Sequence, residues 1–263
     1  MPALPAVAGA FAYAQRVRTL RARGRAPDGR RQLAFYAGVA LVVGGLLLPD
    51  SPFSVHMCQH LLLGDVGPLL IVLGLTGPVL RPLLAVPGLG RLRVLAHPLV
   101  ALPLWAAAFG IWHLSGPYDA SLEHPLLHAG EHFSLFMAGA LMWAAVVEPL
   151  PGPVWFGTGA KAAYVLAVRA IGMGIALGLT FSGPYWRAGG LIMFVEGGIV
   201  TAVAFGLLFL RWWRETERRQ QLIEQGYDSR LAERTARHWP RLQRPPGRAR
   251  SAPTRAARDR FSE

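Results

Sequence analysis

The sequence has few charged residues and a single cysteine, and both shortages exclude classes of protein. Of its 263 residues, 52% are hydrophobic and only 16% are charged, which is not the composition of a soluble globular domain. The single cysteine, Cys58, rules out an intramolecular disulfide framework and CxxC-type zinc or redox motifs. The chain also has no Walker motif, dinucleotide fingerprint or Ser-His-Asp arrangement. We therefore expect an integral membrane protein that is not an enzyme.

Long apolar stretches predict the fold class. Five stretches have the length of about 20 residues that a helix needs to cross a bilayer, and they lie near 56–76, 95–114, 124–147, 160–181 and 190–210. A sixth stretch, 33–48, is shorter and free of charge, and a seventh candidate, 4–14, is short and ends before Arg16. The prediction is an all-α, polytopic transmembrane bundle of seven helices in residues 1–213. Residues 214–263 form a separate tail.

The distribution of basic residues predicts how the chain is oriented. Lys and Arg number 27 against 15 acids, giving a net charge of +12, and most lie between the apolar stretches or in the tail. Basic loops are retained on the cytoplasmic side, so we expect a multi-pass plasma-membrane protein with a cytoplasmic C-terminal tail. The tail has few large apolar residues, and we expect it to be disordered from residue 240 onward. Its basic charge predicts attraction to anionic lipid, with no specific nucleic-acid partner.

Histidines are concentrated near the predicted outer face of the membrane. His56 and His60 are four residues apart, and so are His124, His128 and His132, so each set lies along one face of its helix. His113 ends the stretch before them. Ionisable groups inside a bilayer are costly and usually line a functional site. The pattern predicts that these six histidines form one site.

The donor types favour copper at this site. Imidazole together with thioether suits copper, so we take His56, His60, His124, His128 and His132 as metal ligands, with Met57 and His113 as further candidates. Zinc would accept the same nitrogen donors. Two alternatives stay open, a b-type haem held between two helices in an electron carrier, and a transporter that passes copper or protons.

A second set of buried charges lies deeper in the predicted bundle. Arg169 falls near the middle of its apolar stretch and needs a counter-charge, for which Glu131, Glu196 and Asp65 are available. We expect Arg169, Glu131 and Glu196 to form a buried charge network.

Several motifs together resemble a known family. They are Ser54-Val55-His56-Met57-Cys58-Gln59-His60, Trp112-His113, Tyr118-Asp119-Ala120 and Leu122-Glu123-His124-Pro125-Leu126-Leu127-His128-Ala129-Gly130-Glu131-His132. Over roughly residues 29–213 the chain is similar to the CtaG-type cytochrome c oxidase assembly factors. The resemblance implies a membrane protein needed for the maturation of haem–copper oxidases, delivering copper to an oxidase subunit. The chain departs from the family at Trp186-Arg187-Ala188, where the family tends to have an Asp-Gln pair.

Overall fold

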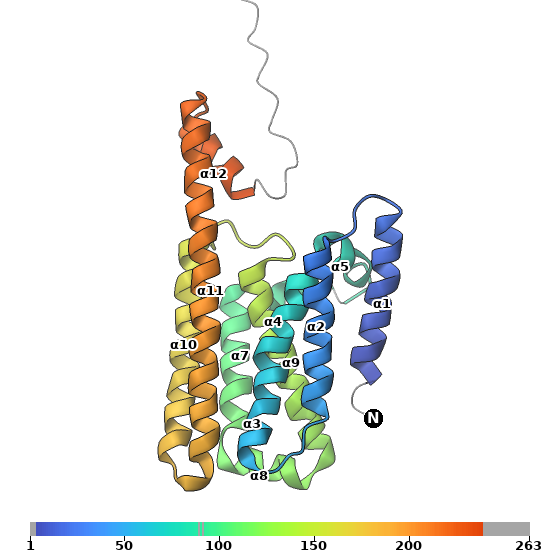
Figure 1. The fold of residues 1–263 in the computed structure, drawn as a ribbon, viewed down its shortest axis with the longest axis vertical. Coiled ribbons are helices and arrows are strands. Elements are labelled where there is room, and N and C mark those ends of the chain that lie inside the picture. The colour runs from blue at the N-terminus through green and yellow to red at the C-terminus, as the bar shows by residue number, and fades with distance from the viewer. Residues whose placement is uncertain (1–3, 89, 91, 239–263) are drawn as a thin grey trace, which may run out of the picture. The chain divides into compact units, whose positions relative to one another are not determined.

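The computed structural model describes residues 4–88, 90 and 92–238, and these residues form helices with no strand among them (Figure 1). The all-α prediction is therefore confirmed. The chain divides into two compact units, residues 1–206 and 207–263. The helices of the chain are α1 (Leu4–Arg21), α2 (Gly29–Leu46), α3 (Phe53–Leu61), the π-helix η1 (Leu62–Val66), α4 (Gly67–Gly74), α5 (Gly77–Leu84), α6 (Leu92–Leu95), α7 (Pro98–Trp112), α8 (Ser115–Glu123), α9 (Pro125–Val147), α10 (Thr158–Phe181), α11 (Pro184–Glu224) and α12 (Ser229–His238).

Four helical segments are long and apolar enough to cross a membrane. They are Phe53–Gly74, Pro125–Val147, Thr158–Phe181 and Pro184–Glu224. A fifth arises if α7 and α8, which bend by 71° at their junction, are counted as one span. The predicted number of seven is not reached among the described residues. The arginines of α1 and the opening Arg30, Arg31 and Gln32 of α2 make these two helices too polar to qualify.

Three predicted segments differ in detail from the helices that form. The stretch 56–76 is interrupted by η1, where the backbone widens from α-helical to π-helical hydrogen bonding. The segment 115–123, between the apolar stretches 95–114 and 124–147, forms the short helix α8. The last apolar stretch belongs to one helix that runs on to Glu224, beyond the residue 213 expected to end the bundle. Residues 240–263, expected to be disordered, lie outside the described residues.

The centre of unit 1 depends on a close approach between α9 and η1. A Cβ atom on Gly139 of α9 would collide with the carbonyl oxygen of Gly64 in η1, so only glycine allows the two backbones to approach this closely. α9 also packs against α4 and α7, and α2 packs against α4 (Figure 1). This packing brings α3, α7 and α9 together, and these three helices carry the predicted ligands.

Helix α1 is joined to the bundle by aromatic and polar contacts. The Tyr13 ring stacks on Phe35 of α2 with centroids 3.7 Å apart, and its hydroxyl donates to the Gly74 carbonyl at 3.1 Å. Arg16 donates to the Pro78 carbonyl at 2.7 Å. The Gly74 carbonyl ends α4, and the Pro78 carbonyl in the first turn of α5 lacks its intrahelical donor because residue 82 is proline, so both side chains satisfy carbonyl groups without intrahelical partners. They give the N-terminal helix a defined position beside α2 and α5.

Unit 2 has a small core of its own. Leu222 near the end of α11 and Ala232 of α12 are buried together, with Tyr227 packed against them. Asp228 accepts a hydrogen bond from the Leu231 amide at 3.3 Å and so caps the start of α12. The chain therefore stays helical well into the basic region that follows the apolar stretches.

Candidate metal centre

Five of the six predicted histidines meet at one end of unit 1. His56 and His60 lie on α3, His128 and His132 lie on α9, and His113 directly follows α7. The distances between ring centroids are 4.4 Å for His56–His60, 5.5 Å for His56–His128, 6.1 Å for His56–His132, 5.5 Å for His60–His113, 5.9 Å for His60–His132 and 4.3 Å for His128–His132. We call these five residues the histidine cluster. The spacing of four residues places each pair on one helix face, and the packing of α3 on α9 turns the faces toward each other.

His124 lies apart from this cluster. It is the residue before α9, its backbone is extended rather than helical, and its side chain is exposed. The helical stripe predicted from the spacing therefore begins at His128. Among the described residues, the two groups that could hold a metal ion do not include His124.

Glu131 of α9 contacts the histidine cluster and is fully buried. Its Oε1 atom is 3.0 Å from His60 Nε2 and 3.8 Å from His56 Nε2. The expected pairing of Glu131 with Arg169 is thus replaced by contact with imidazoles, because Glu131 shares the helix face of His128 and faces α3. His56, His60 and Glu131 form one group whose ligand atoms all lie within 4.8 Å of one another.

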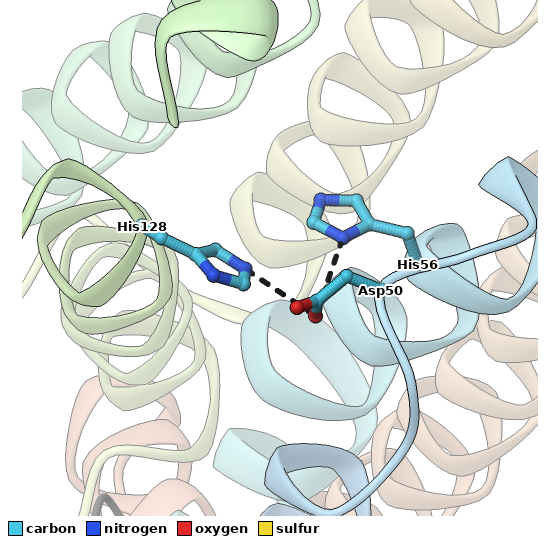
Figure 2. A group of neighbouring side chains, drawn as sticks. All are labelled: Asp50, His56 and His128. Atoms are coloured by element: carbon cyan, nitrogen blue, oxygen red, sulfur yellow. Dashed lines mark ion pairs between the residues drawn. The ribbon is translucent and has the colours of Figure 1, made fainter. Parts of the chain in front are cut away.

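Asp50 joins the cluster from the loop between α2 and α3. Figure 2 shows its carboxylate between two imidazoles, with Oδ1 3.6 Å from His128 Nε2 and 4.0 Å from His56 Nδ1. Gln59 donates to Asp50 Oδ1 at 3.2 Å and to the Leu48 carbonyl at 2.7 Å, which fixes the loop. Asp50, His56 and His128 form a second group with ligand atoms within 4.8 Å.

Buried polar atoms without partners are concentrated in this cluster. In the described part of the chain they include ring nitrogens of His56, His60, His113, His128 and His132 and both carboxylate oxygens of Glu131. His60 and Glu131 approach closely without hydrogen-bond alignment. A buried polar atom left unpaired costs about 1–3 kcal/mol. Lone pairs that converge from different helices fit a metal ion, which would satisfy several of them at once.

Among the described residues, Cys58 belongs to neither group and is a free thiol of intermediate exposure. Met57 is fully buried, and its Cγ atom lies with the Phe53 ring next to Gly189 of α11. The two groups offer imidazole nitrogen and carboxylate oxygen, which suit copper, zinc and other divalent transition metals.

Aromatic side chains pack against the histidine cluster at His56. Tyr118 of α8 lies edge-on to His56 with centroids 5.3 Å apart, and it contacts both Phe53 and Trp186. Trp112 donates to the Ser134 hydroxyl, which in turn donates to the Glu131 carbonyl at 2.9 Å. These contacts restrict the approach of water and hold α7 and α8 against α9.

Arg169 and Glu196 form a separate polar region deeper along the helices. Together with Asp65 of η1 they line a cavity of about 50 Å³, and Asp65 accepts a hydrogen bond from Trp143 Nε1 at 2.6 Å. Arg169 donates to the Phe194 carbonyl at 2.7 Å and lies 5.2 Å from the centre of that ring. The expected ion pair is not formed, since no carboxylate in the described ranges comes within 4.0 Å of the Arg169 side-chain nitrogens. A carbonyl and an aromatic face stabilise the guanidinium instead.

Asp50 is the site residue that sequence reasoning missed. It lies in a loop between two apolar stretches, and loop residues have no helical periodicity that could place their side chains. The available signal was its position six residues before His56, in a loop fixed by Pro49 and Pro52. The carboxylate of a residue in a short loop can lie next to the ligands on the helix that follows the loop.

Comparison with known proteins identifies a related family. The family described as cytochrome c oxidase caa3 assembly factor (Caa3_CtaG) matches residues 11–215. Two uncharacterized proteins, from Mycobacterium bovis and Mycobacterium tuberculosis, are each 28% identical over 167 residues. These matches cover 55% of this chain but only 25% of each mycobacterial protein. No solved structure matches the chain.

Proposed function

The chain belongs to the family of cytochrome c oxidase caa3 assembly factors, and on this basis we propose that it holds copper at the histidine cluster and delivers it to an oxidase subunit. The protein acts as a multi-pass protein of the plasma membrane, with its basic tail in the cytoplasm. The cluster then lies in the outer half of the bilayer. The reaction is transfer of a metal ion between proteins, with no catalytic turnover of a substrate.

One observation carries this proposal, the convergence of buried, unpartnered imidazole nitrogens on Glu131. His56, His60 and Glu131 are fully buried, come from two helices and have no hydrogen-bond partner for these atoms among the described residues. Structural histidines in a membrane helix normally find a partner, because an unsatisfied polar group is costly there. The cluster is better explained by a cation bound between α3 and α9.

The ligand arrangement also suits delivery. A site from which the ion is passed on needs donors that can be exchanged one at a time. The cluster offers more imidazoles than one copper ion needs, in two groups that overlap at His56. Copper can therefore leave by successive replacement of ligands.

A transporter is the second candidate, and the deeper cavity is the observation that favours it. Asp65, Arg169 and Glu196 line about 50 Å³, enough for a few water molecules. A conducting path would continue this polar lining to the opposite end of the helices. Copper uptake by vesicles that contain the purified protein would favour this candidate, whereas copper binding without uptake favours delivery.

A b-type haem suits the described arrangement poorly. A haem needs a flat cavity between two axial ligands, whereas the imidazoles here pack directly on one another with centroids as close as 4.3 Å. We therefore do not propose haem as the cofactor.

The delivery proposal is tested in cells that make the oxidase and a variant of this protein. We expect His60→Ala and His128→Ala to lower the copper content of the purified oxidase strongly, because each removes a ligand. His124→Ala is the matched control, since this exposed residue lies outside the cluster, and it should leave the copper content unchanged. Normal oxidase copper with His60→Ala, at a normal level of the variant in the membrane, would contradict the proposal.

A further inference from the structure

The two groups of donor atoms share one side chain. His56 directs Nδ1 toward Asp50 and Nε2 toward Glu131, at 4.0 and 3.8 Å. The ring therefore lies between two carboxylates that come from opposite directions. Figure 2 shows the first group, in which His56 and His128 approach Asp50 from either side. The two ring nitrogens of His56 therefore face the two groups, one nitrogen each.

The two groups differ in exposure. The Asp50 side chain is 51% exposed and that of His128 is 20% exposed. By contrast, His56, His60 and Glu131 are completely buried. We call Asp50–His56–His128 the exposed group and His56–His60–Glu131 the buried group. Only the exposed group can exchange ligands with a molecule in solution.

The donor types favour Cu(II). Each group combines two imidazoles with one carboxylate, which is Asp50 in the exposed group and Glu131 in the buried group. Nitrogen and oxygen donors suit Cu(II), whereas thiolate and thioether donors select Cu(I).

From this geometry we infer a two-position site for divalent copper. The inference rests on the proposed copper-delivery function and names its exchange step. Copper binds first at the exposed group, through Asp50, His128 and His56 Nδ1, and then moves to the buried group, where His60, Glu131 and His56 Nε2 bind it. The bond from copper to His56 Nδ1 breaks and a bond to Nε2 of the same ring forms. No electron is transferred. The His56 proton sits on the ring nitrogen that does not bind copper, and it moves from Nε2 to Nδ1 through water as the ion moves inward.

The two positions predict different effects for the two carboxylates. Asp50→Asn removes the charge that attracts a dication to the exposed group, while the amide oxygen can still accept the hydrogen bond from Gln59. Copper should still bind, but both loading and removal should slow by about tenfold or more. Glu131→Gln removes a ligand of the buried group and should lower the affinity for copper by about tenfold or more, without slowing removal.

The experiment uses the full chain, purified in detergent without a histidine tag and loaded with copper sulfate. Electron paramagnetic resonance measures bound Cu(II), and stopped-flow absorbance measures the rate at which excess EDTA removes it. Asp119→Asn, which removes another exposed carboxylate near this end of the bundle, is the matched control and should exchange copper at the wild-type rate.

Each outcome separates this inference from the proposed function. Slow exchange by Asp50→Asn alone, with the Cu(II) signal retained, supports the two-position site. Bound copper without a Cu(II) signal, or equal exchange rates for Asp50→Asn and Asp119→Asn, would overturn the inference and leave the proposed function standing. Wild-type protein that binds no copper in either oxidation state would overturn both.

Discussion

Replacing His60 by alanine separates a metal ligand from a packed core histidine. His60 is fully buried, and its Nε2 atom is 3.0 Å from Glu131 Oε1. If the ring is a ligand, copper stabilises the wild-type protein and no longer stabilises the variant. If the ring only packs, copper changes the stability of the wild type and of the variant by the same amount.

The size of the effect follows from linkage. Copper at 100 times its dissociation constant stabilises the folded state by about 2.7 kcal/mol. For a folded unit of this size, each kcal/mol raises the Tm by about 2–4 °C, so copper should raise the wild-type Tm by about 5–10 °C. Loss of the fully buried imidazole also leaves a cavity next to Glu131, so the metal-free variant should be less stable than the metal-free wild type. The variant should therefore unfold earlier and show no shift with copper.

Thermal unfolding in detergent, with and without copper, measures both effects. Glu131→Gln, which removes another ligand of the buried group, should also reduce the copper shift, and combining it with His60→Ala should lose little more copper affinity than His60→Ala alone, because ligands of one site are not additive. His124→Ala is the control that should keep the full shift. A His60→Ala variant that copper stabilises as much as the wild type would refute the assignment of His60 as a ligand.

Two further predictions concern charged side chains outside the histidine cluster. Gly197→Ala should lower the stability of the protein and displace the guanidinium, because a Cβ atom at residue 197 would collide with Arg169. Gly198→Ala is the control and should be nearly neutral, because its Cβ atom would lie at an ordinary contact distance of 3.8 Å from Arg169. Equal melting temperatures for the two variants would contradict this position of Arg169. Lys161→Met should cost about 3–5 kcal/mol, because it removes the ammonium 2.8 Å from the mostly buried Glu148. Denaturation in detergent measures that loss, and adding Glu148→Gln should recover part of it; a fully stable Lys161→Met protein would show that the pair is not needed.

The sequence predicted the fold class and most of the site because both depend on helical periodicity. Apolar stretches of membrane-spanning length gave the all-α architecture, and spacing of four residues placed His56 with His60 and His128 with His132. The count of seven spans is not confirmed, because the arginines that open α2 and the 71° bend between α7 and α8 separate these segments from the four helices that qualify by length and apolar composition. The π-helix at Leu62–Val66 has no signature in the apolar pattern.

Tertiary contacts decided the remaining features of the site. The stripe of three histidines was shortened because the helix starts at Pro125, after His124. Asp50 entered the site through the path of a loop, which side-chain periodicity does not describe. Charge pairing suggested Glu131 as a partner for Arg169, but the packing of α9 on α3 directs this carboxylate to His60. Such choices depend on how helices pack, and a single sequence does not specify that directly.

The most direct test of the central claim is metal analysis of the protein purified from its membrane without a histidine tag, together with its absorption spectrum. The account predicts copper bound to the wild-type chain and to His124→Ala, its loss from His60→Ala, and no Soret band. Wild-type protein that contains haem or only zinc, or a His60→Ala variant that retains its copper, would contradict it.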